Sequence, residues 1–301
     1  LRIDIAAAGS HPFANHMYQR VTNNDRYAEL INRTQYWGRQ MLLFGTHVHV
    51  GLDRRDKVLP ILQSLLTRAY HIQSLSASSP FWAGNRTNYA SNRAMVFQQL
   101  PTAGTPRQFD TWDQLEHYTE DMRKTGTIEE FNEVRWDVRP SPGWGTIEVR
   151  VADASPNLLE LRAVAALIHC LVDHFAAELD AGREIPTIPD WYVAENKWRS
   201  ARYGMDAILI KDKYGNEELV SDTIRETVTQ LEPVAQRLGC LSELEGIFQI
   251  LDMGAAYQRF LAVSDAHGGS LDAVVEHMRE EMKAERPLPA EATQNHPDGL
   301  R

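Results

Sequence analysis

Hydrophobic and polar positions along this chain alternate between strand-like and helix-like spacing. Residues 1–8 have the short apolar pattern of a strand, and residues 25–41 place apolar side chains at helical spacing, which predicts an amphipathic helix. Residues 42–52 (LLFGTHVHVGL) are rich in apolar and β-branched residues and are interrupted by glycines. This composition predicts a buried strand.

The middle of the chain predicts a long helix and then a hairpin. Asp53 is a candidate N-cap for a helix over residues 53–78, which Pro60 would bend. Residues 79–106 read as a long polar loop, and loops of that length are often functional. Residues 132–153 contain two strand patterns joined by a turn rich in proline and glycine, which predicts an antiparallel hairpin.

The last half is predicted to be mainly helical. Ser155 and Pro156 would supply the N-cap and first position of a helix over residues 157–180, and further helices are expected at 190–203, 221–238 and 242–253. Ser242 and Glu245 have the spacing of a capping box, and the loop at His267 would start another helix. We expect one α+β domain over residues 1–285 and a mobile tail over residues 286–301.

Composition and charge narrow the class of protein. The 301 residues are 24% charged and 43% hydrophobic, which is ordinary for a soluble globular protein. No run approaches the ~20 apolar residues of a membrane span, and the first residues do not resemble a signal peptide, so we expect a cytoplasmic protein. A net charge of −10 without a basic cluster argues against nucleic acid and against an anionic membrane surface as partners. Cys170 and Cys240 read as two reduced, largely buried thiols.

Two histidines one residue apart are the first candidate for chemistry. Side chains alternate between the faces of a strand, so His47 and His49 point to the same side, about 6.5 to 7 Å apart. Burying two imidazoles requires two sets of polar partners. We therefore favour a metal or phosphate role for at least one of them, and a structural pair is the alternative.

The predicted hairpin adds a polar face. Glu148 and Arg150 share one side of the second strand, and Arg135, Asp137 and Arg139 alternate along the first. Such pairs are commonly surface ion pairs, but on two adjacent strands they would form a continuous polar face suited to an anion and its metal. Guanidinium groups suit phosphate and carboxylate because they donate two parallel hydrogen bonds.

Two more polar segments belong to the candidates. The loop around residues 85–93 carries Arg86, Tyr89 and Arg93, and the predicted helix over 190–203 places Arg199 and Arg202 on one face beside Asn196. The ordinary alternative for the second group is a solvated helix face. No P-loop, Rossmann glycine pattern or G-x-S-x-G motif is present in the sequence.

Four stretches together resemble the glutamate-cysteine ligase type 2 family, the YbdK-like carboxylate-amine ligases. They are FGTHVHVG, YASNRAMVFQQLPTAGTP, WDVRPSPGWGTIEVRVAD and AENKWRSARYG, in this order. The resemblance runs from Leu1 to about Lys283. It implies membership of the glutamine synthetase-like superfamily, with a curved, mainly antiparallel sheet flanked by helices.

The resemblance implies site roles. His47 and Glu148 correspond to metal ligands, His49 lies near the phosphates, and Arg139 and Arg150 face the transferred phosphoryl group as catalytic residues. Arg86, Tyr89 and Arg93 correspond to the substrate loop, and Asn196, Arg199 and Arg202 to a motif that we place with the nucleotide. The implied cofactors are ATP and Mg²⁺, with Mn²⁺ as a substitute. Family members also carry N-terminal strands with metal-binding glutamates, which this chain lacks.

The expected activity is ATP-dependent joining of the γ-carboxyl of glutamate to an amine, that of cysteine, through a γ-glutamyl phosphate. The segment 81–93 would form part of a cover that excludes water. Two alternatives remain open: a binding protein without catalysis, and a metal-dependent hydrolase in which His117, His169 or His174 completes a site in a (β/α)₈ barrel. The expected partners are small molecules, and apolar helix faces leave a homo-oligomer open.

Overall fold

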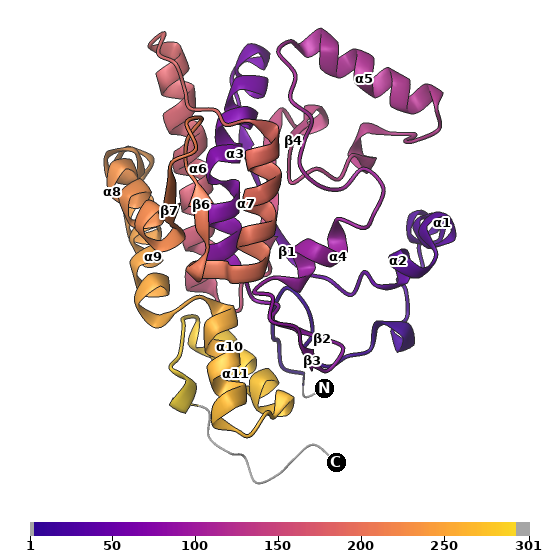
Figure 1. The fold of residues 1–301 in the computed structure, drawn as a ribbon, viewed down its shortest axis with the longest axis vertical. Helices are drawn as coiled ribbons and strands as arrows, with labels where there is room; N and C mark the ends of the chain where they lie inside the picture. Colours follow the sequence, from indigo (N-terminus) through magenta and orange to yellow (C-terminus); the bar gives the residue numbers. More distant parts are fainter. Residues whose placement is uncertain (1–2, 293–301) are drawn as a thin grey trace.

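The computed structural model describes residues 3–292 and has an α+β architecture of helices around small antiparallel sheets (Figure 1). The strands are β1 (Gly45–Gly51), β2 (Phe81–Trp82), β3 (Asn85–Arg86), β4 (Val138–Ser141), β5 (Thr146–Asp153), β6 (Ile208–Ile210) and β7 (Glu217–Leu219). The helices before β4 are α1 (Asp25–Thr34), α2 (Tyr36–Arg39), α3 (Val58–Ser76), α4 (Asn92–Phe97) and α5 (Trp112–Lys124). Those after β5 are α6 (Leu158–Asp180), α7 (Asp190–Tyr203), α8 (Val220–Leu238), α9 (Leu241–Met253), α10 (Ala256–Ala266) and α11 (Leu271–Ala284).

The largest sheet among the described residues has three antiparallel strands in the order β1-β5-β4. Its apolar face carries Val50, Val138, Ile147, Val149 and Val151, all in the main core. Helices α3 and α6 lie against the strands on this side. Because side chains alternate along a strand, the residues between these apolar positions point to the opposite face.

Helix α3 begins later than the sequence suggested. The expected N-cap Asp53 is wrong, since a 3₁₀ turn (Arg55–Lys57) precedes α3 and Asp53 instead accepts a hydrogen bond from Lys57 Nζ at 3.1 Å. Pro60 lies in the first turn of α3. Its missing N–H has no intrahelical partner to lose there, so it does not require a bend.

The N-terminal expectations are corrected in two places. Residues 3–8 form no strand, and the nearest pairing is an isolated bridge between Ser10 and Leu43, while residues 1 and 2 lie outside the described part. The single helix expected over residues 25–41 is split into α1 and α2 at Gln35, whose φ of 49° interrupts the helix. A side chain at this φ is uncommon, and periodicity alone does not reveal it.

Helix starts were predicted less well than helix bodies. The N-cap of α6 is Asn157, whose side chain accepts from the Glu160 amide, so the assignment to Ser155 and Pro156 is wrong. The capping box at Ser242 is also wrong, because α9 already begins at Leu241. Helices α7 and α8 lie where they were expected, and Ser270 caps α11 as the loop at His267 suggested.

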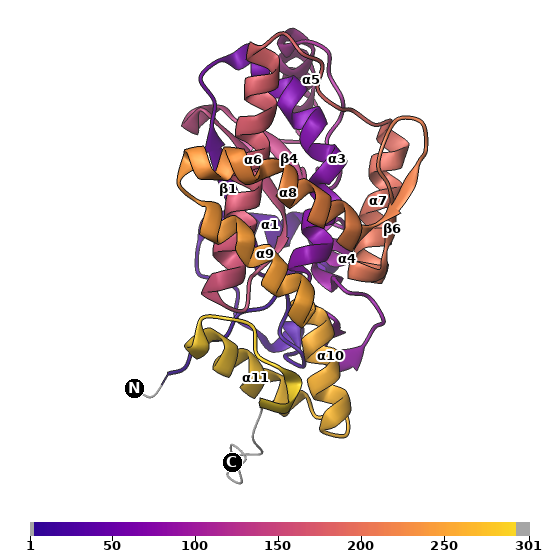
Figure 2. The same cartoon turned by 90° about the vertical axis from the view of Figure 1, so that its left-hand side faces the viewer.

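The loop expected over residues 79–106 contains more structure than its composition indicated. It holds the β2–β3 hairpin and α4, and Phe81 is buried in a second core with residues of α10 and α11. These two helices form a separate layer at one end of the molecule (Figure 2). Phe81 is thereby anchored in that layer, so the expected cover cannot include it as a mobile part.

Helix α11 is followed by a short segment that returns to the fold. The Leu288 amide donates to Glu281 Oε1 at 3.2 Å, and the 3₁₀ turn Ala290–Ala292 lies beside α10. The rest of the expected tail, residues 293–301, lies outside the described part. None of the helices within residues 3–292 combines the length and apolar character required to span a bilayer.

Candidate active site

A row of charged and imidazole side chains crosses the open face of the β1-β5-β4 sheet. The strand register places His49 of β1 and Arg139 of β4 on either side of Glu148 of β5. His47 and Arg150 lie one step further along the same face. We call these five residues the polar face: His47, His49, Arg139, Glu148 and Arg150.

Glu148 is the centre of the polar face. Its Oε2 accepts from Arg139 Nε at 2.7 Å, and its Oε1 accepts from Arg150 Nη1. His47 Nδ1 lies 3.2 Å and His49 Nε2 3.5 Å from the same Oε1. The Glu148 side chain is 3% exposed, whereas the two histidines are 36% and 38% exposed. The carboxylate is therefore the floor of the face and the imidazoles are its accessible edge.

The protonation of this cluster follows from burial and neighbouring charge. Burial opposes ionisation of Glu148, but the hydrogen bond from His47 and the guanidinium groups of Arg150 and Arg139 outweigh it, so the pKa of Glu148 lies well below its usual range. Burial, with a contribution from Arg150, lowers the pKa of His47 despite the opposing effect of Glu148. At neutral pH the face thus combines a carboxylate, two guanidinium groups and a neutral His47.

Local backbone features shape the end of the polar face that carries His47 and Arg150. The β1–β5 register shifts between Thr46 and Val48, where the single β1 residue His47 lies opposite Arg150 and Val151 of β5, and such irregularities commonly re-aim a side chain. Arg93 is 5% exposed and donates to the carbonyls of Arg150 and Val151. The guanidinium group of Arg93 lies directly against Gly45, where an added Cβ would come within 2.2 Å of Nη2. Arg93 therefore fixes the backbone at one end of the polar face.

The polar face is shorter than the sequence suggested, because Arg135 and Asp137 do not belong to it. Asp137 is buried and accepts from Lys197 Nζ at 2.7 Å and from Tyr70 Oη at 2.9 Å, so it joins β4 to α7 and α3. Arg135 Nη1 donates to backbone carbonyls of Pro101 and Glu133. Strand β4 begins only at Val138, so the alternation expected for these two residues does not extend to them.

The substrate-loop candidates are dispersed. Arg86 pairs with Asp265 of α10 at 2.7 Å, and the Tyr89 ring lies under the guanidinium group of Arg202. Only Arg93 of this group reaches the strands of the polar face. Substrate contact by Arg86 and Tyr89 stays a prediction, since their described contacts are with other parts of the protein.

The candidates on α7 have structural partners. The side-chain amide of Asn196 exchanges two hydrogen bonds with the backbone of Ile210 in β6. Arg199 pairs with Glu195 and Glu217, and Arg202 donates to the Asn88 carbonyl. Their assignment to the nucleotide stays a prediction. The same motif supplies Lys197 and Trp198 to a cavity that sequence reasoning missed.

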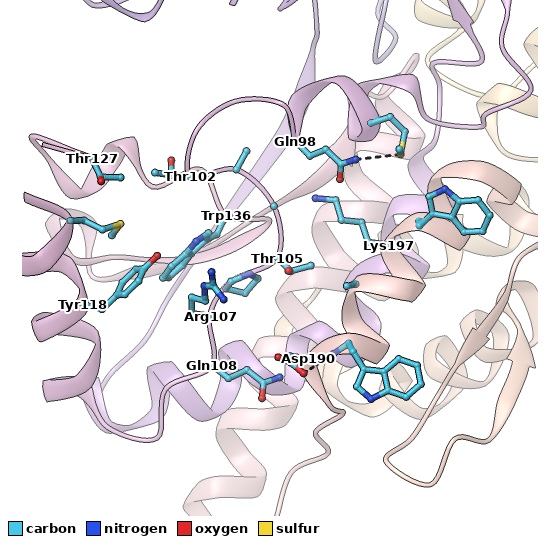
Figure 3. Close-up of a pocket in the computed structure, with 18 residues that line it drawn as sticks. Gln98, Thr102, Thr105, Arg107, Gln108, Tyr118, Thr127, Trp136, Asp190 and Lys197 are labelled. Carbon is cyan, nitrogen blue, oxygen red and sulfur yellow. Dashed lines mark hydrogen bonds between the residues drawn. The ribbon is translucent and has the colours of Figure 1, made fainter. Parts of the chain in front are cut away.

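This cavity lies between α4, α5, α7 and the segment 102–108, with a volume of about 790 Å³. Figure 3 shows Arg107 beside Trp136 and Tyr118, with Lys197 and Gln98 on another wall. Trp191, Ala194 and Trp198 line it from one face of α7, and within residues 3–292 the Arg107 guanidinium group has no hydrogen-bond or ion-pair partner. We call it the aromatic cavity. The spacing of Trp191 and Trp198 along the sequence puts both indole rings on one face of α7, and this spacing could have indicated the cavity.

The polar face does not by itself fit a metal ion. Both Glu148 oxygens are engaged by guanidinium groups, and within residues 3–292 no three His, Cys, Asp or Glu side chains are arranged to hold a metal. One carboxylate is also a small share of the oxygen ligands that Mg²⁺ requires. The donor set, which includes two guanidinium groups, fits an anion better than a bare cation.

Comparison with known proteins identifies the family of this chain. The profile of glutamate-cysteine ligase family 2 (GCS2) matches residues 1–277. A curated relative from Paenarthrobacter aurescens strain TC1, named "Putative glutamate–cysteine ligase 2-2", is 55% identical over 93% of this chain and 73% of its own. A relative from Mycobacterium ulcerans strain Agy99, with a name of the same form, is 52% identical over 93% of this chain and 71% of its own.

Among solved structures, the glutamate–cysteine ligase of Francisella tularensis in complex with AMP has a similar fold. The TM-score is 0.54 at 14% identity, over 89% of this chain and 63% of that one. Within residues 3–292, every pairing between the named strands is antiparallel. A (β/α)₈ barrel is built from parallel strands, so the hydrolase alternative is excluded. The family match and the identity to curated relatives together establish that this chain belongs to glutamate-cysteine ligase family 2.

Proposed function

We propose that this protein is an ATP-dependent glutamate–cysteine ligase that forms the amide through a γ-glutamyl phosphate. The observation that carries the proposal is the open face on which Arg139 and Arg150 flank the buried Glu148. The names of the relatives support the reaction, and the AMP complex of the structural neighbour supports a nucleotide as co-substrate.

The chemistry assigned to these side chains is electrostatic. Transfer of a phosphoryl group spreads negative charge over its oxygens, and most of its catalysis comes from positioning and charge stabilisation. Arg139 and Arg150 would donate to these oxygens, while Glu148 holds both guanidinium groups in place. His49, whose Nδ1 lies 2.9 Å from Thr146 Oγ1, is oriented at the accessible edge and would contact the phosphates.

Magnesium enters this proposal only with the nucleotide. When bound, Mg²⁺ would supply charge neutralisation at the phosphates. His47 and Glu148 remain the candidates nearest to such an ion, but the described residues do not complete its coordination. We also propose that the three-stranded sheet is part of the curved sheet typical of the glutamine synthetase-like superfamily, within a catalytic domain spanning residues 1–285, and that the enzyme works in the cytoplasm, where ATP is abundant.

The aromatic cavity is the proposed seat of the nucleotide base. Stacking of a base on aromatic side chains contributes about 1–3 kcal/mol, and the cavity offers indole rings at 63% and 41% exposure, those of Trp191 and Trp198. Arg107 is available there for an anionic group. The cavity and the polar face share the segment 132–137, since Trp136 lines the cavity and Arg139 Nη1 donates to the Asn132 and Val134 carbonyls.

The first test measures ADP and γ-glutamylcysteine formed by the full-length protein from ATP, glutamate and cysteine. Glu148→Gln should lower the rate by about 10² or more, because Arg139 and Arg150 lose the charge that positions them. Glu280→Gln is the matched control, since Glu280 pairs with Lys283 on the exposed side of α11. Absence of product from the parent protein while AMP still binds would favour the non-catalytic binding protein.

The second test follows AMP binding by tryptophan fluorescence. AMP should quench the emission, and Arg107→Ala should weaken binding about tenfold, as expected for loss of a charge-assisted hydrogen bond. Arg225→Ala, on α8, should bind as the parent does. If Arg107→Ala has no effect while Arg139→Ala abolishes binding, the whole nucleotide belongs on the polar face.

A further inference from the structure

The two cysteines, 70 positions apart in sequence, are neighbours in the fold. Cys170 lies in the middle of α6 and Cys240 at the N-cap of α9, and their Sγ atoms are 3.7 Å apart. Both are free thiols. Two sulfurs at van der Waals contact on elements that pack against each other are close to the arrangement of a disulfide.

The two thiols differ in access. Cys170 is fully buried in the main core, whereas Cys240 is partly exposed and lines an open pocket of about 430 Å³. The other walls of this pocket include Arg162, His169 and Glu243. A small solute can therefore reach Cys240 but not Cys170.

This pocket also borders strand β1. Val48, His49, Val50 and Gly51 of β1 form part of its lining, so Cys240 borders the strand that carries the histidines of the candidate active site. A group attached to Cys240 would occupy space beside β1. This position gives a modification of the thiol a route to affect the site.

We propose that Cys240 is a modification site for low-molecular-weight disulfides and that Cys170 resolves the adduct. The Cys240 thiolate attacks one sulfur of the reagent RSSR, a mixed disulfide forms, and RS⁻ leaves and takes a proton. The Cys170 thiolate then attacks Cys240 Sγ, the Cys170–Cys240 disulfide forms, and the second RSH leaves. Overall, two protein thiols are oxidised and one RSSR is reduced to two RSH.

The order of attack follows from the surroundings of each sulfur. Burial raises the pKa of the Cys170 thiol to about 12, and its contact with Cys240 adds to this effect. The thiolate is the reactive form, so Cys170 is a poor first nucleophile. Once Cys240 carries an adduct, the Cys170 sulfur is already in position for the second step.

The co-reactant class is a disulfide of a small thiol. If the proposed function holds, on which this identification of the reagent rests, the acceptor substrate cysteine has its own disulfide, cystine, in the same class. The product crosslink would close a loop of about 70 residues between α6 and α9, and crosslinks of that length stabilise a fold by restricting its unfolded chain.

The test treats the full-length protein with cystine and follows it by intact mass and thiol titration. We expect a transient cysteinyl adduct, then loss of two hydrogens and of both titratable thiols, with a higher Tm that reducing agent reverses. Cys170→Ser should stop at the adduct, and Cys240→Ser should gain none. These readouts need no ligase activity, so they stand apart from the test of the proposed function.

A second measurement uses the parent protein, so it does not depend on whether the cysteine variants fold. Brief alkylation of the unmodified protein by iodoacetamide should label Cys240 at least about tenfold faster than Cys170, because the thiolate of an accessible cysteine reacts first. Equal labelling, adduct formation on Cys240→Ser, or a parent protein that keeps both thiols after cystine treatment would each overturn the proposal.

Discussion

Glu148 shows how much of the candidate site depends on a single buried carboxylate. Two guanidinium groups and an imidazole converge on its two oxygens. Its pKa in the folded protein is lower than in the unfolded chain, so the ionised cluster stabilises the fold above the usual carboxylate pKa. That stabilisation declines as the pH falls below the usual carboxylate pKa and is gone once the pH reaches the depressed folded value, although the Glu148 carboxylate itself stays ionised in mild acid.

His71 is a second buried titratable residue whose pKa gives a prediction about stability and pH. It is buried in α3, its two ring nitrogens have no hydrogen-bond partner among the described residues, and burial lowers its pKa to about 3. The unfolded chain binds a proton near pH 6.5 and the folded one does not. Stability is therefore lost as the pH falls below 6.5, by about 2 kcal/mol between pH 6.5 and 5.

The measurement is urea unfolding of the parent and of His71→Leu at pH 7, 6 and 5. The difference between the two free energies of unfolding should grow by about 2 kcal/mol over this range in favour of the leucine variant. His117→Leu is the control, because His117 is 78% exposed on α5. Parallel pH profiles for parent and His71→Leu would contradict the burial argument.

At the scale of elements, strand β1 has a glycine at each end with different surroundings. An added Cβ at Gly45 would overlap the buried Arg93 guanidinium group, whereas at Gly51 it would meet nothing within 4 Å. Arg93 is held by two β5 carbonyls, so it has little freedom to move away. Gly45 is thus required by close packing and Gly51 is not.

Gly45→Ala should therefore lower the free energy of unfolding by about 1–3 kcal/mol, the usual cost of overpacking. Gly51→Ala should change it by less than about 0.5 kcal/mol, as is typical of exposed positions. Urea unfolding of both variants at pH 7 makes the comparison. Equal effects at the two ends would show that Arg93 does not anchor the strand.

At the scale of the whole molecule, an ionic cluster attaches the layer of α10 and α11 to the main body. Arg259 of α10 donates to Glu160 of α6 and to Glu281 of α11, and all three are almost fully buried. Burial opposes ionisation of Glu281, but His277 and Arg259 lower its pKa to about 2. Arg259 is the shared partner, so its loss leaves two buried carboxylates without a counter-charge.

Arg259→Leu should destabilise the protein by about 3–5 kcal/mol, as expected when one partner of a buried ion pair is removed. The backbone amides of α10 and α11 should exchange with solvent faster than those of α3. Arg225→Leu, which removes an exposed pair with Asp252, should cost at most about 1 kcal/mol. Uniform exchange across the molecule in Arg259→Leu would indicate that the end layer does not open separately.

Sequence by itself determined the strand with His47 and His49, the hairpin with Glu148 and Arg150, the bodies of the later helices and the family. These features depend on local periodicity and on spacing along the chain, which a sequence contains in full. Only the tertiary structure decided that Asp137 faces Lys197, that Asn196 holds β6, that Cys170 meets Cys240, and that α7 borders a cavity. Each of these is a contact between distant segments, and residue type does not specify which of several polar partners a buried group will meet once the elements pack.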